Sequence, residues 1–201
     1  MMGLTLLVLS LTVQAQENAN SRQARKMFEE VLQKITGPQG STMHYNANVA
    51  GIYKTEGTIW YKGKKSRYLS KNSKAWNDGV SAYVIRNNKK EVEIYDADSP
   101  RQSRFGDTFK LNPENYTYHI AADPKGYLLT LKSKKGVKGM KELRALIDKS
   151  TRSPIQLRIK VAFFWANVDV SDFKSGGISD DLFIFPRNQY KDYEMIDRRG
   201  E

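Results

Sequence analysis

The spacing of apolar residues changes along the chain, from a helical repeat near the start to alternation over most of the remainder. Between Ser21 and Ile35 apolar residues recur every three or four positions, which predicts one amphipathic helix packed on a sheet. Asn20 or Ser21 can cap the start of this helix, and Gly37-Pro38 ends it.

Alternating apolar and polar residues predict strands after Gly40. The alternation is clearest from Met43 to Gly51 and from Ile155 to Val161, and it continues through Phe163 and Trp165. Shorter candidate strands are Gly57–Lys62, Ser66–Ser70, Ala82–Arg86, Glu91–Asp96, Tyr127–Lys132, Glu142–Asp148 and Asn167–Phe173. Met140–Ile147 combines helix-favouring composition with alternation, and we interpret it as a strand. The pattern therefore predicts about nine strands.

Short polar separators set how these strands are connected. Asn77-Asp78-Gly79, Asn87-Asn88, Asp123–Gly126 and Asp148–Pro154 all have turn-forming composition. Parallel neighbours would need crossovers of about a dozen residues or more, so these short links favour an antiparallel sheet.

The polar stretch from Ser99 to Tyr118 interrupts the strand pattern, although it contains five large apolar or aromatic residues. These are Phe105, Phe109, Leu111, Tyr116 and Tyr118. Connections of this length are usually functional or flexible. Two interpretations stay open, a short helical lid over the sheet and a surface loop whose aromatic side chains enter the core.

Residues 1–15 have the pattern of a secretory signal peptide. An apolar core runs from Leu4 to Val13, and Val13 and Ala15 occupy the −3 and −1 positions of a cleavage site, although no Lys or Arg precedes the core. We expect export, followed by a single domain over residues 16–201. The chain has no cysteine, so neither a lipid anchor nor a disulfide is expected.

The net charge of +11 comes from short lysine and arginine runs that usually mark a solvated surface. A basic chain of this kind invites a nucleic-acid interpretation, which export to the periplasm argues against. Anionic membrane surfaces and phosphate-bearing headgroups remain candidate contacts.

Catalysis is not expected. The two histidines, His44 and His119, lie far apart in the sequence, and neither belongs to a metal-binding or catalytic-triad motif. We expect no cofactor, no metal and no enzymatic activity.

Three segments together resemble the periplasmic outer-membrane lipoprotein carrier (LolA-like) family. The first is Gly57–Tyr68, where a glycine and an apolar pair precede a basic turn. The second is Trp76-Asn77-Asp78-Gly79 with the strand that follows it, and the third is Phe183-Ile184-Phe185-Pro186 with the chain end through Asp197-Arg198. Their order and spacing agree over nearly the whole mature chain.

The resemblance implies a mainly β fold, with a strongly curved antiparallel sheet forming an unclosed, half-open barrel, an N-terminal helix and a short helical lid. It implies a monomeric carrier of an acylated lipoprotein or lipid, with an inner-membrane release complex and an outer-membrane acceptor as partners. The family arginine that helps to hold the lid is replaced here by Gly63. Lys64 and Arg67 are the candidates to contact the lid or a headgroup in its place, although lysine lacks the planar fork of arginine.

The candidate cavity residues are apolar members of the predicted strands and lid. They are Val49, Ile59, Tyr61, Leu69, Val84, Ile94, Phe109, Leu129, Ile159 and Phe163. For each of them ordinary core packing is the alternative role. For the whole protein, the expected function is acyl-chain transport toward the outer membrane. The alternatives are a lipid-sensing envelope-stress or regulatory module of the same fold and a structural β-domain with a filled core.

Overall fold

A computed structural model describes residues 18–102 and 112–200 of the chain. The predicted signal peptide, residues 1–15, lies outside these ranges, as do Phe105, Phe109 and Leu111 of the predicted lid. None of the helices in the described ranges is long and apolar enough to cross a bilayer.

The predicted N-terminal helix is present as α1, Ala19–Thr36. Its cap is Asn18, whose side chain accepts a hydrogen bond from the Ser21 backbone N–H, so the helix begins slightly earlier than the sequence predicted. Gly37 ends it, as expected. The apolar stripe of the helix buries four side chains, which are Ala24, Met27, Phe28 and Val31.

Twelve strands form one sheet over the described residues. They are β1 Ser41–Val49, β2 Tyr53–Lys62, β3 Lys65–Ser70, β4 Lys74–Asn77, β5 Ser81–Arg86, β6 Glu91–Asp96, β7 Tyr116–Asp123, β8 Gly126–Ser133, β9 Met140–Asp148, β10 Pro154–Val161, β11 Phe164–Ser175 and β12 Glu194–Asp197. The described residues also form four short 3-10 helices, namely η1 Pro100–Gln102, η2 Pro113–Asn115, η3 Asp180–Phe183 and η4 Arg187–Tyr190.

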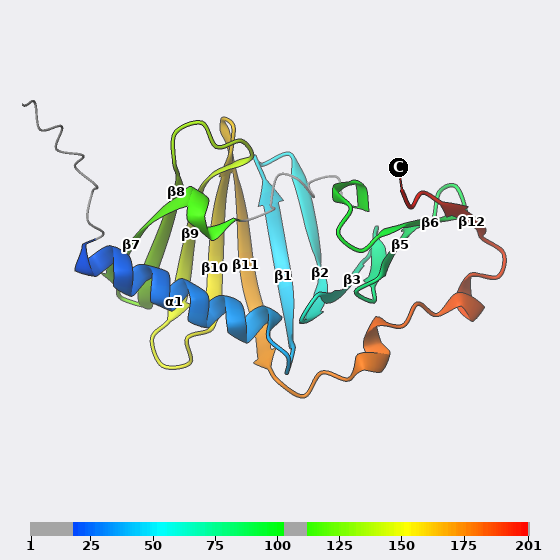
Figure 1. Cartoon of the computed structure of the whole chain (residues 1–201), viewed down its shortest axis with the longest axis horizontal. Helices are drawn as coiled ribbons and strands as arrows, with labels where there is room; N and C mark the ends of the chain where they lie inside the picture. The colour runs from blue at the N-terminus through cyan, green and yellow to red at the C-terminus, as the bar shows by residue number, and fades with distance from the viewer. Residues whose placement is uncertain (1–17, 103–111, 201) are drawn as a thin grey trace, which may run out of the picture.

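The sheet is curved and does not close, as predicted (Figure 1). Its strand order is β12-β6-β5-β4-β3-β2-β1-β11-β10-β9-β8-β7, so β12 and β7 are its two edges. Neighbouring strands are antiparallel, except that β12 pairs with β6 in parallel. The chain reaches β12 through the long C-terminal segment that follows β11, which is why this pair can be parallel.

The helix covers one face of the sheet, which we call the inner face. Its buried side chains form a core with strands β7 to β9; Phe28, for example, packs against Tyr118 with ring centroids 5.7 Å apart. Directly paired residues of adjacent strands point to the same side of a sheet, so the register allows this face to be followed from β7 across to β6.

The C-terminal segment covers the opposite, outer face over β3 to β6. Phe185 stacks on Tyr83 with ring centroids 4.6 Å apart and contacts Trp76 edge-on at 5.7 Å. Tyr190 joins the same cluster, and Val92 of β6 is fully buried beneath it. The two faces of the sheet are therefore covered at different places, the inner face by α1 and the outer face by residues after β11.

Asn20 of the helix also contacts the edge strand β7. Its side-chain amide donates to the Ile120 carbonyl oxygen at 2.8 Å and accepts from the Ile120 N–H at 3.0 Å. The residue that the sequence suggested as a helix cap thus binds the backbone of the sheet.

Three strands were not predicted from the sequence, namely β4, β7 and β12. The predicted continuation of one strand through Phe163 and Trp165 was wrong, because a turn at Ala162 and Phe163 separates β10 from β11. Tyr116 and Tyr118, which the sequence placed in the lid stretch, belong to β7 and are buried. The ambiguous Met140–Ile147 segment is a strand, as interpreted.

Candidate functional site

An apolar strip, which we call the inner strip, crosses the middle of the inner face between the region under α1 and a smaller cluster on β4 to β6. The smaller cluster contains Ala82, Val84 and Tyr95. The strip is formed by the inward residues of β10, β11, β1, β2 and β3, which are Ile159, Val168, Val170, Met43, Tyr45, Ile59, Tyr61 and Tyr68. Met43 and Tyr45 are buried, whereas the other six are half-buried.

Three tyrosines bring hydroxyl groups into this strip. The Tyr45 and Tyr68 hydroxyls are hydrogen-bonded to each other, and the two rings stack with centroids 5.6 Å apart. Burial, together with the hydrogen bond to Tyr68, raises the pKa of Tyr45, and burial raises the pKa of Tyr61 to about 12. The Tyr45 and Tyr61 hydroxyls therefore stay neutral at physiological pH. None of the eight strip residues is an acidic or basic type.

Gly57 makes the close approach of these tyrosines possible. A Cβ atom at this position would lie 2.3 Å from the Leu69 carbonyl oxygen and 2.9 Å from the Tyr45 hydroxyl. Only glycine fits between the two without a backbone shift.

The structure brings six of the predicted cavity residues to the inner face. These are Val49, Ile59, Tyr61, Val84, Leu129 and Ile159. Val84 is 3% exposed and Leu129 is 1% exposed, so both are already packed within the protein. Ile59, Tyr61 and Ile159 are half-buried members of the strip. Val49 is also half-buried, at the end of β1, where it pairs with Ala166 and Tyr53.

The other four predicted residues lie elsewhere. Leu69 and Ile94 point to the outer face, since Leu69 pairs with Thr58 and Ile94 pairs with Tyr83. Phe163 is 94% exposed in the turn between β10 and β11. Phe109 lies outside the described residues.

Arg67 is on the outer face, sandwiched between two tryptophans. Its guanidinium carbon lies 5.2 Å from the Trp60 ring centroid and 5.4 Å from that of Trp76. Lys64 lines a cavity of about 560 Å³ beside Gly79 and Val80 of the β4–β5 turn. Arg67 and Lys64 therefore both lie away from the inner strip.

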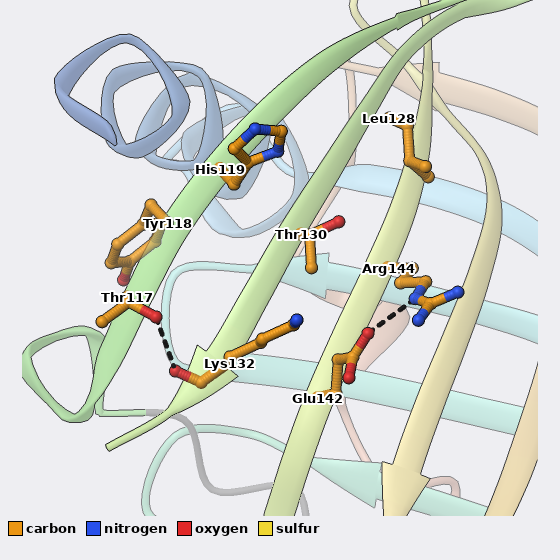
Figure 2. Close-up of a pocket in the computed structure, with 8 residues that line it drawn as sticks. All are labelled: Thr117, Tyr118, His119, Leu128, Thr130, Lys132, Glu142 and Arg144. Atoms are coloured by element: carbon orange, nitrogen blue, oxygen red, sulfur yellow. Dashed lines mark hydrogen bonds and ion pairs between the residues drawn. The ribbon is translucent and has the colours of Figure 1, made fainter. Parts of the chain in front are cut away.

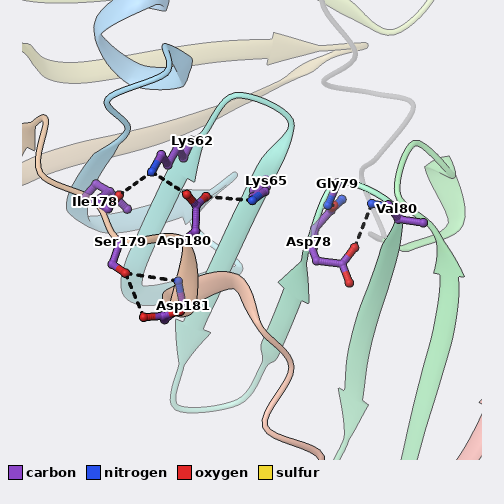
Figure 3. Close-up of polar contacts among 10 residues, drawn as sticks. Lys62, Lys65, Asp78, Gly79, Val80, Ile178, Ser179, Asp180 and Asp181 are labelled. Carbon is purple, nitrogen blue, oxygen red and sulfur yellow. Dashed lines mark hydrogen bonds and ion pairs between the residues drawn. The ribbon is translucent and has the colours of Figure 1, made fainter.

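The basic turn between β2 and β3 fastens the C-terminal segment (Figure 3). Lys62 Nζ donates to Asp180 Oδ2 at 3.0 Å and to the Ile178 carbonyl oxygen at 2.9 Å, while Lys65 Nζ donates to Asp180 Oδ1 at 2.8 Å. The hydrogen bonds from Lys65 and Lys62 lower the pKa of Asp180. The resemblance implied that this turn holds a lid, but two of its lysines bind the segment after β11.

A second cavity, of about 410 Å³, lies on the outer face of β7 to β9 (Figure 2). Arg144 Nε donates to Glu142 Oε1 at 2.6 Å, and the Thr117 hydroxyl donates to the Lys132 carbonyl oxygen at 3.3 Å. His119 lines this cavity together with Thr117, Thr130 and Lys132. Within residues 18–102 and 112–200, no group of three or more His, Asp or Glu side chains is placed to hold a metal.

Sequence reasoning missed five strip residues, which are Met43, Tyr45, Tyr68, Val168 and Val170. The alternation of their strands showed that each has an apolar side. Only the register between strands distant in the sequence shows that these sides form one continuous surface.

No family model matches the sequence, and a comparison with curated proteins finds no match. Comparison with solved structures does find likenesses. An uncharacterized conserved protein from Thermus thermophilus is similar with a TM-score of 0.60 and 11% identity, over 88% of this chain and 99% of that one. MucB is similar with a TM-score of 0.50 and 13% identity, over 82% of this chain and 63% of MucB.

A LolA superfamily protein, NE2245 from Nitrosomonas europaea, is also similar, with a TM-score of 0.41 and 8% identity over 85% of this chain and 100% of that one. The family that the sequence resembles is thus represented among the similar structures. At these identities the likeness concerns the fold, which the Thermus protein and MucB show most directly.

Proposed function

We propose that this protein is a carrier that binds the acyl chain of a lipid or lipoprotein along the inner strip and delivers it toward the outer membrane. The observation that carries the proposal is the half-buried apolar strip between two covered regions of the sheet. A curved sheet that carries an apolar strip without charged residues is suited to hold one elongated apolar ligand.

The free energy of acyl transfer supports the need for a carrier. Burial of one methylene contributes about 0.8 kcal/mol, so a sixteen-carbon chain resists entering water by roughly 12 kcal/mol. A protein that provides apolar contacts for part of that chain lowers the barrier to transfer, and no bond needs to be broken. The neutral Tyr45 and Tyr61 hydroxyls fit this role, because a buried charge would oppose an apolar ligand.

The proposed compartment is the periplasm, reached through cleavage of residues 1–15. Expression in a Gram-negative host, followed by fractionation and N-terminal sequencing of the product, tests this part separately. A full-length product in the cytoplasm would contradict it.

Acyl binding itself is tested by titrating the purified protein with a fluorescent fatty acid. We expect saturable uptake of one probe per chain, in competition with unlabelled palmitate. A well-folded protein that takes up no probe would contradict the proposal and favour the structural β-domain. Mass spectrometry of lipids that co-purify from the native host would then identify the cargo.

The likeness to MucB favours a second candidate, a lipid-sensing regulatory module of the same fold. MucB from Pseudomonas aeruginosa has been solved in complex with MucA. A regulator must hold a protein partner in a lipid-dependent way, whereas a carrier must pass its lipid to acceptor membranes. Transfer of the bound probe to acceptor vesicles distinguishes the two, since only the carrier proposal requires it.

A further inference from the structure

Two tight turns lie side by side at one end of the sheet. The β1–β2 turn contains Ala50 and Gly51, and the β10–β11 turn contains Ala162 and Phe163. Val49 pairs with Ala166, and the Ala50 N–H donates to the Trp165 carbonyl oxygen at 3.0 Å. Figure 1 shows both turns at the upper end of the sheet, away from the C-terminal end of α1. We call residues 50–53 and 162–164 the paired tips.

The paired tips expose large apolar side chains. Ile52 is 91% exposed, Phe163 is 94% exposed, and Tyr53 and Phe164 are about half exposed, at 47% and 50%. Of the seven large hydrophobic residues exposed within the described ranges, these four are gathered here, and the other three are Leu32, Val80 and Ile184. Single exposed apolar residues are ordinary, whereas a contiguous group usually marks an interaction site.

A lysine-rich connection lies at the same end. The pair Val161–Met140 places residues 134–139, the lysine loop, beside the β10–β11 turn. This loop contains three exposed lysines, Lys134, Lys135 and Lys138, and no acidic residue. On the outer face just below the tips, Arg158 and Lys160 lie over the Trp165 ring, at 5.0 and 5.8 Å from its centroid.

We propose that the paired tips dock this protein on an anionic lipid bilayer, with Ile52, Phe163 and Phe164 entering the interface and the lysine loop contacting the headgroups. Exposed aromatic and aliphatic side chains surrounded by lysines are what such an interface binds, through apolar burial and attraction to anionic lipid. The partner is a membrane surface, because the charge of the loop is positive throughout and the tips protrude.

Docking in this orientation would place the ends of β1, β2, β10 and β11, and with them the upper end of the inner strip, against the bilayer. This proposal concerns only the tips and the lysine loop at the end of the sheet, so membrane docking can be tested independently of acyl binding on the inner face.

Co-sedimentation of the full chain with vesicles tests the proposal. We expect binding to vesicles of phosphatidylglycerol and phosphatidylethanolamine at low salt, with much weaker binding to pure phosphatidylcholine. Phe163→Ser with Phe164→Ser should weaken the binding about 100-fold, because two aromatic rings no longer enter the interface. Lys135→Gln with Lys138→Gln should weaken it about 25-fold, since each lysine near an anionic surface contributes about fivefold.

Matched controls carry the same changes elsewhere. Lys125→Gln with Lys149→Gln removes two exposed lysines from turns at the opposite end of the sheet, and Val80→Ser with Ile184→Ser removes exposed apolar side chains outside the tips. Each control should change binding by less than about threefold, because only the overall charge or a distant surface is altered. Uptake of fluorescent fatty acid should be unchanged in the tip variant.

Tryptophan quenching gives a second readout that does not depend on the tip variant folding. Trp165 lies next to the tips, whereas Trp60 and Trp76 lie toward the other end of the sheet. Anionic vesicles with brominated acyl chains should quench the tryptophan fluorescence of the wild-type protein. They should leave the fluorescence of the Trp165→Phe variant largely unchanged, because its remaining tryptophans lie away from the tips. The proposal would be overturned if the protein did not bind vesicles, if the Phe163→Ser, Phe164→Ser variant bound them as well as the wild type, or if the control variants lost as much vesicle binding as the tip and loop variants. A protein partner would then be the better occupant of the paired tips.

Discussion

Substitution of Ile59 by aspartate should separate ligand binding from stability. Ile59 is half-buried in the inner strip, paired with Met43 on one side and Tyr68 on the other. Full burial of an isoleucine contributes about 1.5–3 kcal/mol, so loss of a half-buried one should cost about 1–2 kcal/mol. A domain with a total stability of about 5–15 kcal/mol stays folded after such a loss.

The effect on acyl binding should be larger. A ligand on the strip would desolvate the new carboxylate, at a cost of at least about 3 kcal/mol, which corresponds to binding about 100-fold weaker. The assay is titration with a fluorescent fatty acid, together with a thermal melt of the same preparation.

Thr58→Asp is the matched control, because Thr58 is the preceding residue of β2, is also half-buried, and points to the outer face. It should bind the probe like the wild type. Equal binding by Ile59→Asp, or an equal loss in Thr58→Asp, would show that the inner strip is not where the ligand lies.

Three further predictions concern stability. Burial would raise the pKa of Glu93, but hydrogen bonds from Arg86 and Tyr95 outweigh it and lower the pKa below the ordinary 4.5. The ionised Glu93 therefore stabilises the folded protein above pH 4.5, and this contribution is lost as the pH falls through the lowered pKa. Glu93→Gln should therefore cost about 1–3 kcal/mol at neutral pH and flatten the fall in melting temperature on acidification; an unchanged pH profile would contradict this. Gly57→Ala should destabilise by about 1–3 kcal/mol in urea unfolding, because its Cβ would overlap the Leu69 carbonyl oxygen, and a neutral result would mean that β2 shifts freely. Phe185→Ala should cost about 3–5 kcal/mol by the same measurement, since Phe185 is 9% exposed among Trp76, Tyr83 and Tyr190, and a loss below about 1 kcal/mol would show that the C-terminal segment is not a structural cover.

Local patterns were sufficient to predict α1 and most of the hairpins. The helix has an apolar stripe and the strands alternate, and both patterns arise from side-chain directions within one element. β12 has no such local signal, because it is four residues long and its partner, β6, is about a hundred residues away in the chain. β7 does alternate, but two of its buried tyrosines were assigned to the preceding loop, which hid the strand.

The candidate site was only partly predictable for a different reason. An apolar residue in a strand is expected to face a core, but this sheet has a core on both sides, under α1 on the inner face and under the C-terminal segment on the outer face. Leu69 packs against the outer core and Ile94 points to the same face, whereas Ile59 and Ile159 point to the inner face. Alternation alone cannot distinguish these two environments, whereas the register can.

The hydrogen bonds between Asn20 and Ile120 have a consequence for self-association. An unclosed sheet ends in strands whose free N–H and C=O groups can recruit a strand from another molecule, which leads to aggregation. The Asn20 amide occupies one donor and one acceptor in the middle of β7, much as a residue of a further strand would. A second chain could add to this edge only by displacing the amide, so a single side chain on α1 helps to keep an open sheet from growing.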